Sequence, residues 1–297
     1  MKPALLKMHL AVFLWGFTGV LGRLISLSEG PLVWWRLCIT SITLWVLFFV
    51  TGNIQRVTFK DFLKIAGIGS LLALHWLFFY GSIKFANVSI ALTCLSTTGL
   101  LSAVIEPLFF RKKIDLFELL LGLFALAGIG LIYLSNLKFS TGIYIGLLSA
   151  VTTATVSILN KKIVSGYHPM AITLYQLSGG FAGLTLIMPL YNYLFPAKYL
   201  MPQHFDWLWL VLLSWVCTIF TFFLYIASLK KVSAFTANLL LTLEPVYGII
   251  LAFIVFHENK ELHNNFYGGF ALISLAVVLQ MVRLVRQGRK AVLEQAQ

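Results

Sequence analysis

The sequence predicts an all-α integral membrane protein with ten transmembrane helices arranged as two inverted five-helix repeats. Three observations support this fold class: apolar stretches of membrane-spanning length, positive charge that alternates between loops, and a weak internal repeat. Of the 297 residues, 60% are hydrophobic and 11% are charged. Apolar residues make up only about 45–50% of a typical soluble domain. Helices are the expected element because a spanning segment must satisfy its own backbone hydrogen bonds.

Hydropathy separates the chain into apolar segments of about 20 residues, the length that crosses a hydrocarbon core about 30 Å thick. In chain order these ten segments are 8–27, 31–51, 62–83, 88–110, 116–135, 141–160, 169–190, 207–228, 234–256 and 264–282. Cys38, Cys94 and Cys217 all lie inside such segments, which provides no disulfide framework. Arg23 and the absence of a small-residue cleavage site indicate that the first segment is retained as a helix.

The lysines and arginines divide unequally between the two sides of the membrane. With the N-terminus inside, the inner side holds sixteen of them: Lys2, Lys7, Arg56, Lys60, Lys64, Arg111, Lys112, Lys113, Lys161, Lys162, Lys230, Lys231, Arg283, Arg286, Arg289 and Lys290. The outer side holds five: Arg23, Lys84, Lys138, Lys198 and Lys260. Cytoplasmic loops carry such an excess, so both termini are expected in the cytoplasm. Topology and contact with anionic lipid headgroups explain the net charge of +12 more simply than nucleic acid does.

An internal repeat relates residues 79–134 to residues 225–280 at an offset of 146, with ten identical positions. Each copy belongs to a unit of five helices, and an odd number inverts the second unit in the membrane. The charges agree with inversion, because segment 111–115 is net positive whereas its equivalent 257–261 is net negative. Inverted repeats are common in secondary transporters, whose substrate site lies near the midplane between the halves.

Several stretches resemble the EamA-type transporters of the drug/metabolite transporter superfamily. The clearest is Leu239-Leu240-Leu241-Thr242-Leu243-Glu244-Pro245-Val246, followed by His257-Glu258 and Gly268; Trp15-Gly16 and His75-Trp76 are also similar to the family. The resemblance implies two EamA-like repeats, at residues 1–137 and 138–283, followed by a basic cytoplasmic tail at residues 284–297. It also implies a secondary transporter, often an exporter of amino acids or other small metabolites, without implying the substrate.

The first repeat departs from the family pattern. Gly99 stands where Pro245 sits in the second repeat, and Arg111-Lys112 replaces the usual Gly-Glu pair. In the second repeat, His257 replaces the usual glycine. These departures argue against assuming that both halves work alike.

Glu244 is the first candidate for a functional residue. Inserting a charged side chain at the bilayer centre costs at least about 2.5–3.5 kcal/mol of free energy, so such residues usually have a function. It is the eleventh residue of segment 234–256 and therefore lies near the midplane. Pro245 lacks an N–H and frees the carbonyl of Leu241, so the helix can kink there. Glu244 could bind a substrate amine or act as a proton-coupling site. Alternatively, it is a protonated acid that caps the freed carbonyl and has no transport role.

His75 and Arg36 are two further candidates for substrate binding. His75 lies midway along the third segment, where it either bonds to a neighbouring helix or titrates in a cavity. A histidine and a carboxylate at similar depth can form a proton relay, which pairs His75 with Glu244 in proton coupling. Arg36 either snorkels to the interface or pairs with a substrate carboxylate.

Deep aromatic residues are candidates for lining a cavity that binds an aromatic or cationic ligand. They are Trp15, Trp76, Tyr175 and Tyr247. Packing against lipid is the alternative for each of them. Gly16 and Gly19 most simply allow close helix contact, and with Pro245 they could also act as hinges during transport.

The absence of known catalytic motifs narrows the function classes. The sequence contains no G-x-x-x-x-G-K-[ST], H-E-x-x-H or C-x-x-C motif, so we expect no ATP-driven motor, catalytic residue, metal site or cofactor. The prediction is a secondary transporter that exports a small metabolite, such as an amino acid or related amine, across the cell (inner) membrane by alternating access. An intramembrane lipid-modifying enzyme, a channel or a partner-binding subunit are the alternatives. The expected partners are a small-molecule substrate and membrane lipids, with a homodimer left open.

Overall fold

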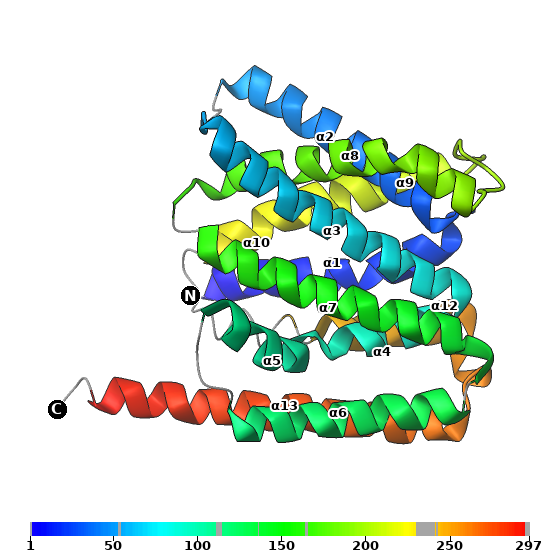
Figure 1. The fold of residues 1–297 in the computed structure, drawn as a ribbon, viewed down its shortest axis with the longest axis vertical. Helices are drawn as coiled ribbons and strands as arrows, with labels where there is room; N and C mark the ends of the chain where they lie inside the picture. The colour runs from blue at the N-terminus through cyan, green and yellow to red at the C-terminus, as the bar shows by residue number, and fades with distance from the viewer. Residues whose placement is uncertain are drawn as a thin grey trace.

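The structure, a computed structural model, describes residues 2–52, 55–110, 115–135, 137–163, 166–229, 241 and 243–294. Every regular element in these ranges is a helix, and the helices run side by side across the view in Figure 1. The start of α1 (Lys2–Leu24) and the end of α13 (Asn264–Glu294) lie on the same side of the bundle in Figure 1.

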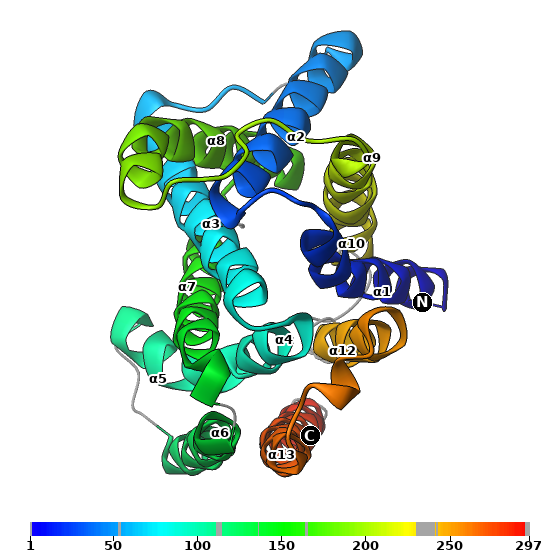
Figure 2. The same cartoon turned by 90° about the vertical axis from the view of Figure 1, so that its right-hand side faces the viewer.

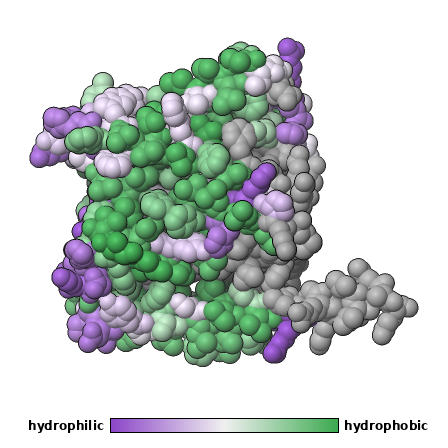
Figure 3. All heavy atoms as spheres, turned by 180° about the vertical axis from the view of Figure 1, so that it is seen from behind, coloured by the Kyte–Doolittle hydropathy of each residue, from purple (hydrophilic) through white to green (hydrophobic). Residues whose placement is uncertain are grey.

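Most of the long helices are apolar enough to cross a membrane. Among the described residues, seven meet this criterion: α1 (Lys2–Leu24), α2 (Glu29–Thr51), α3 (Phe59–Phe85), α6 (Leu116–Ser135), α7 (Ser140–Ile163), α8 (Pro169–Leu194) and α13 (Asn264–Glu294). Shorter apolar stretches are found at Val88–Ser102, Asp206–Phe220 and Leu243–Phe256. Hydrophobic residues cover most of the face in Figure 3, and hydrophilic residues gather mainly at its edges. The protein is therefore a multi-pass membrane protein.

The segment predicted as one helix at 88–110 is instead divided at Thr97. Helix α4 (Val88–Ser96) ends before this residue and α5 (Thr98–Phe110) begins after it. The Thr97 hydroxyl donates to the Cys94 carbonyl at 2.6 Å, and the Thr98 hydroxyl donates to the Leu95 carbonyl at 2.6 Å. Such side-chain bonds compete with the helical ladder, which explains the break in an otherwise apolar segment.

The segment predicted at 207–228 is also less regular than a single α-helix. It contains α9 (Asp206–Val211), a π-helical stretch η2 (Leu212–Phe220) and α10 (Thr221–Leu229). The Thr218 hydroxyl donates to the carbonyl of Leu213, five residues earlier, at 2.8 Å. π-Helical turns are often found at functional sites, so η2 is a candidate part of a functional site.

The ninth predicted segment is described only in part. Residues 230–240 and 242 lie outside the described residues, and α12 spans Leu243–Phe256. The kink expected at Pro245 therefore stays a prediction. The basic residues Arg111–Lys113 and Lys230–Lys231 also lie outside the described ranges. Two short 3₁₀ turns, η1 (Leu137–Phe139) and η3 (Glu258–Lys260), connect neighbouring helices.

Helix α3 packs most extensively on α8 and α7. Glycines allow the close approach: a Cβ added at Gly69 would lie 1.9 Å from the Gln176 carbonyl oxygen of α8. Helix α1 packs on α12 and α10, and α6 pairs with α13 at one side of the bundle (Figure 2). Helices α1, α3, α4, α10 and α12 surround the centre of the end view (Figure 2).

Candidate functional site

Arg36 of α2 lies inside the bundle, with only 3% of its surface exposed. Its Nη1 donates to the Tyr80 hydroxyl of α3 at 2.8 Å, and its Nε and Nη2 donate to the Thr218 hydroxyl of η2 at 3.2 and 2.9 Å. Ser214 of η2 donates its hydroxyl to the Arg36 carbonyl at 3.2 Å. The side chain is thus held within the bundle, whereas snorkelling would extend it along the surface.

Two aromatic rings of α3 lie close to the Arg36 guanidinium. Its Cζ lies 3.9 Å from the centre of the Trp76 ring and 5.9 Å from that of Tyr80. The quadrupole of an aromatic ring attracts a cation, more strongly where water is excluded. A guanidinium has five N–H donors, one on Nε and two on each of Nη1 and Nη2. The bonds to Tyr80 and Thr218 use one N–H of each nitrogen. One N–H on each terminal nitrogen is therefore left without an acceptor among the described residues.

Glu244, in the first turn of α12, interacts electrostatically with Arg36. The two side chains form no hydrogen bond or ion pair with each other, although both belong to the described part of the chain. Charged groups within a membrane protein usually pair and mark substrate or ion pathways. Arg36 therefore has a nearby acid and retains the capacity to bind a further anion.

Trp15 of α1 is connected to this cluster through the hydroxyl of Thr221. Its Nε1 donates to the Thr221 hydroxyl at 2.8 Å, and that hydroxyl donates to the Thr218 carbonyl at 3.0 Å. The Trp15 ring also contacts Phe222 and Tyr225, with centroid separations of 6.1 and 5.4 Å. Thr221 thus connects Trp15 to Thr218, the residue that accepts from Arg36.

His75 of α3 faces α7 with one edge of its ring. Its Nδ1 lies 2.5 Å from the Thr153 hydroxyl and 2.9 Å from the Ser149 hydroxyl, and its ring stacks on Phe79. It interacts electrostatically with Arg36, and among the described residues no hydrogen bond or ion pair joins it to Glu244. This geometry matches the interhelical bonding alternative, and the described residues show no direct bond between the two partners of the predicted relay.

Two of the predicted aromatic residues form hydrogen bonds to partners other than the Arg36 cluster. The Tyr175 hydroxyl donates to the Gln55 carbonyl at 2.9 Å, in the connection between α2 and α3. The Tyr247 hydroxyl lies 2.8 Å from His9 Nε2, between α12 and α1. A Cβ at Gly16 would lie 2.9 Å from the Tyr247 Cβ, and one at Gly19 would lie 2.8 Å from a Val88 methyl. Gly16 and Gly19 thus permit close helix contact, while their hinge role stays a prediction.

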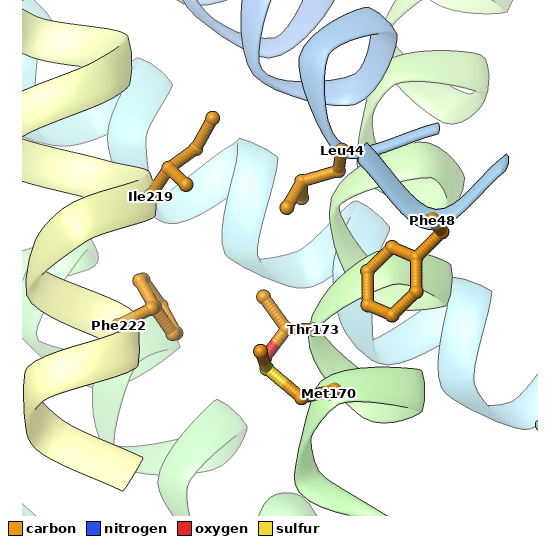
Figure 4. Close-up of a pocket in the computed structure, with 6 residues that line it drawn as sticks. All are labelled: Leu44, Phe48, Met170, Thr173, Ile219 and Phe222. Carbon is orange, nitrogen blue, oxygen red and sulfur yellow. The ribbon is translucent and has the colours of Figure 1, made fainter. Parts of the chain in front are cut away.

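A small apolar pocket lies at the junction of α2, α8, η2 and α10. The side chains that line it point toward one another in Figure 4: Leu44, Phe48, Met170, Thr173, Ile219 and Phe222. Ile219 directly follows Thr218, which accepts two bonds from Arg36. Helices α2 and η2 therefore contribute residues both to this pocket and to the Arg36 cluster.

Polar contacts link the helix ends where α1 leads into α2. The buried Glu258 of η3 forms an ion pair with Arg23 and accepts bonds from the Val88 and Ser89 backbone amides at 3.0 and 2.8 Å. Asp206, at the start of α9, accepts a bond from the Ser26 amide at 2.7 Å. Lys84 donates to the Ile25 carbonyl at 2.5 Å. These contacts join the ends of α1, α3, α4, α9 and η3.

Sequence reasoning missed Tyr80 and Thr218 as partners of Arg36. Tyr80 lies one helical turn after Trp76, so helical spacing from that tryptophan could have identified it. Thr218 gave no such signal, because its position depends on the π-helical register of η2. No group of three potential metal ligands occurs among the residues that the structure describes.

The chain matches the EamA-like transporter family over residues 2–134 and again over residues 140–280. It is similar to the uncharacterized transporter YxxF of Bacillus subtilis (strain 168), at 22% identity over 97% of this chain and 92% of the relative. An uncharacterized transporter of Archaeoglobus fulgidus is 22% identical over 91% of this chain and 96% of its own length. A crystal structure with 17% identity superposes with a TM-score of 0.61, covering 96% of this chain and 99% of that one, and shows the same fold. The chain belongs to the EamA-like transporter family.

Proposed function

We propose that this membrane transporter is a secondary transporter that exports a small metabolite, an amino acid or related amine, across the cell membrane by alternating access. The cluster around Arg36 carries the proposal. Arg36 and Trp76 come from the first family match, whereas Thr218 and Glu244 come from the second. A cation and an acid contributed by different halves suit a substrate that carries both charges, at the position expected for transporters built from repeats.

The polar contacts at the α1–α2 end support the alternating-access part of the proposal. Arg23, Glu258, Asp206 and Lys84 hold together helix ends from both family matches. Because the charge distribution predicts that this end faces outside, these contacts would close the proposed state to the exterior. Export would require these contacts to break while the Arg36 cluster stays near the midplane. Both termini would be cytoplasmic.

Counterflow in proteoliposomes tests the transport proposal. Vesicles that contain the protein are loaded with the twenty amino acids and short primary amines, and exchange against labelled external compounds is followed by mass spectrometry. We expect exchange of at least one compound, its loss in Arg36→Ala, and its retention in Lys64→Ala, whose side chain is exposed and bonded to Asp61. Exchange by no compound above protein-free vesicles contradicts the proposed substrate class.

Glu244 is the proposed proton-coupling residue. In Glu244→Gln, we expect a pH gradient no longer to drive accumulation, while downhill counterflow continues, because the amide cannot release a proton. His75→Asn tests the second member of the relay in the same vesicles. Unchanged pH-driven accumulation in Glu244→Gln removes the proton role.

A further inference from the structure

The π-helical stretch η2 (Leu212–Phe220) has a conformation that its own sequence does not explain. π-Helices are rare and are mostly limited to single turns, whereas η2 covers nine residues. Its sequence, LLSWVCTIF, contains no proline or glycine that would disfavour an α-helix. The backbone N–H of Thr221 donates to the Val216 carbonyl, five residues earlier, which is the π pattern. Contacts with other helices therefore have to favour this register.

The hydroxyl of Thr218 joins the register of η2 to Arg36. A threonine hydroxyl has one donor and two acceptor positions. The Thr218 hydroxyl accepts from Nε and Nη2 of Arg36 at 3.2 and 2.9 Å, so its own hydrogen is left for the Leu213 carbonyl at 2.8 Å. Leu213 lies five residues before Thr218, whereas a threonine in an α-helix commonly donates to the carbonyl four residues earlier, as Thr43 does to Ile39. The guanidinium thus orients a bond that spans the π turn.

Helix α2 is bonded to η2 at two further points. Ser214 donates its hydroxyl to the Arg36 carbonyl at 3.2 Å, and the Trp215 indole N–H donates to the Thr43 hydroxyl at 3.1 Å. Hydrogen bonds in which one group is charged are stronger than bonds between neutral groups. Thr218 is completely buried, so no water competes for the Arg36 guanidinium at this contact. The Arg36–Thr218 contact is therefore the strongest of the bonds that join α2 to η2.

The register of η2 sets the rotation of α10 (Thr221–Leu229), which follows it directly and packs on α1 (Figure 2). In this register Thr221 accepts from the Trp15 indole N–H at 2.8 Å, and Phe222 and Tyr225 contact the Trp15 ring. Conversion of one π turn to an α turn shifts the register by one residue. One residue corresponds to a rotation of about 100° around an α-helix. Such a rotation would turn all three α10 residues away from Trp15.

We propose that Thr218 is a positioning residue and that η2 is a register switch, which Arg36 holds in the π form. While the guanidinium is bound to the Thr218 hydroxyl, α10 presents Thr221 to Trp15. When Arg36 leaves Thr218, η2 adopts the α register and α10 rotates. The consequence for transport rests on the proposed function: a step that moves Arg36 also changes the surroundings of Trp15, on a different helix.

Double electron–electron resonance on the purified full chain tests the register switch. The three native cysteines are first replaced, by Cys38→Ala, Cys94→Ala and Cys217→Ala. Nitroxide labels are then attached to Leu126→Cys on α6 and Phe220→Cys at the end of η2. The control pair combines Leu126→Cys with Leu208→Cys on α9, which precedes η2. All three native side chains are exposed large hydrophobics, so the labels replace no buried contact.

Thr218→Val keeps the shape of the side chain and removes its hydroxyl. We expect the distance from Leu126 to Phe220 to change by about 3–8 Å, because a helix with its side chains is about 10–12 Å across and a rotation of about 100° displaces a label on its surface by up to about 8 Å. The distance from Leu126 to Leu208 should stay the same. Thr218→Ser keeps the hydroxyl and should restore the original distance to Phe220.

Arg36→Met tests the other partner of the contact. It removes the donors to Thr218, so we expect the same change in the distance to Phe220, and no further change when it is combined with Thr218→Val. It also provides the test if Thr218→Val does not fold. A change in Thr218→Val without one in Arg36→Met overturns the role of Arg36.

The remaining outcomes also decide the proposal. An unchanged distance to Phe220 in both variants overturns the register switch, and so does an equal change in the control pair or a change in Thr218→Ser. The distances are measured without substrate, so they are independent of transport. A missing change leaves counterflow to decide the transport proposal, and a failure of counterflow leaves the distances to decide the register switch.

Discussion

Glu258 shows how a single residue can join distant parts of the chain. It is completely buried, forms an ion pair with Arg23, and accepts two backbone N–H groups at the start of α4. A carboxylate at a helix N-terminus satisfies free N–H groups and interacts favourably with the helix dipole. His257 presents it on a left-handed backbone with φ of 55°, which is the conformation that glycine adopts most easily. This explains why the resemblance expects glycine at that position.

Glu258→Gln should destabilise the protein by about 3 kcal/mol, because it removes one partner of a buried ion pair. Glu261→Gln is the matched control. Glu261 is 40% exposed in its side chain and lies 3.5 Å from the same Arg23, so its loss should cost less than about 1 kcal/mol. Unfolding in mixed micelles at neutral pH measures both changes. Equal costs would contradict the role assigned to burial.

The helix pair α3–α8 depends on glycine at the crossing. The Gly69 position abuts the Gln176 carbonyl, and a Cβ at Gly180 would lie 2.7 Å from the Gly69 oxygen. These contacts involve backbone atoms, which cannot rotate away as a side chain can. The crossing holds together α3, which carries Trp76 and Tyr80, and α8, which contributes Met170 and Thr173 to the pocket.

Gly69→Ala should lower stability by about 1–3 kcal/mol, because the added methyl forces the two backbones apart. Gly67→Ala, two residues away on α3, meets no atom within 4 Å and should raise stability by up to about 1 kcal/mol through helix propensity. Thermal unfolding in detergent compares the two variants. A stabilising Gly69→Ala would show that the helices do not approach as closely as described.

At the scale of the whole molecule, the helices form a bundle with a network of polar contacts at one end. The end at which α1 leads into α2 is joined by Arg23, Glu258, Asp206 and Lys84. Helices α6 and α13 pair at one side of the bundle (Figures 1 and 2). The positive-inside rule predicts that the side of the bundle with the chain ends faces the cytoplasm, because the sequence assigns most lysines and arginines to that side.

Cysteine labelling in intact cells tests this orientation. In a background that carries Cys38→Ala, Cys94→Ala and Cys217→Ala, we expect an impermeant maleimide to label Lys198→Cys without lysis. Arg56→Cys should be labelled only after the membrane is permeabilised. The opposite pattern would reverse the orientation derived from charge.

The sequence by itself determined the membrane class, the approximate positions of the long helices and the family, because apolar length, loop charge and short motifs are local properties of the chain. It also identified Arg36, Trp76 and Glu244 as candidates, since each is unusual in an apolar segment. Only the tertiary structure decided that Arg36 binds Tyr80 and Thr218, that His75 faces α7, and that Tyr175 and Tyr247 form hydrogen bonds to other partners. These facts depend on the rotation of each helix and on the π-helical register of η2. Packing between segments that are distant in the sequence sets the helix rotation, which no local pattern records.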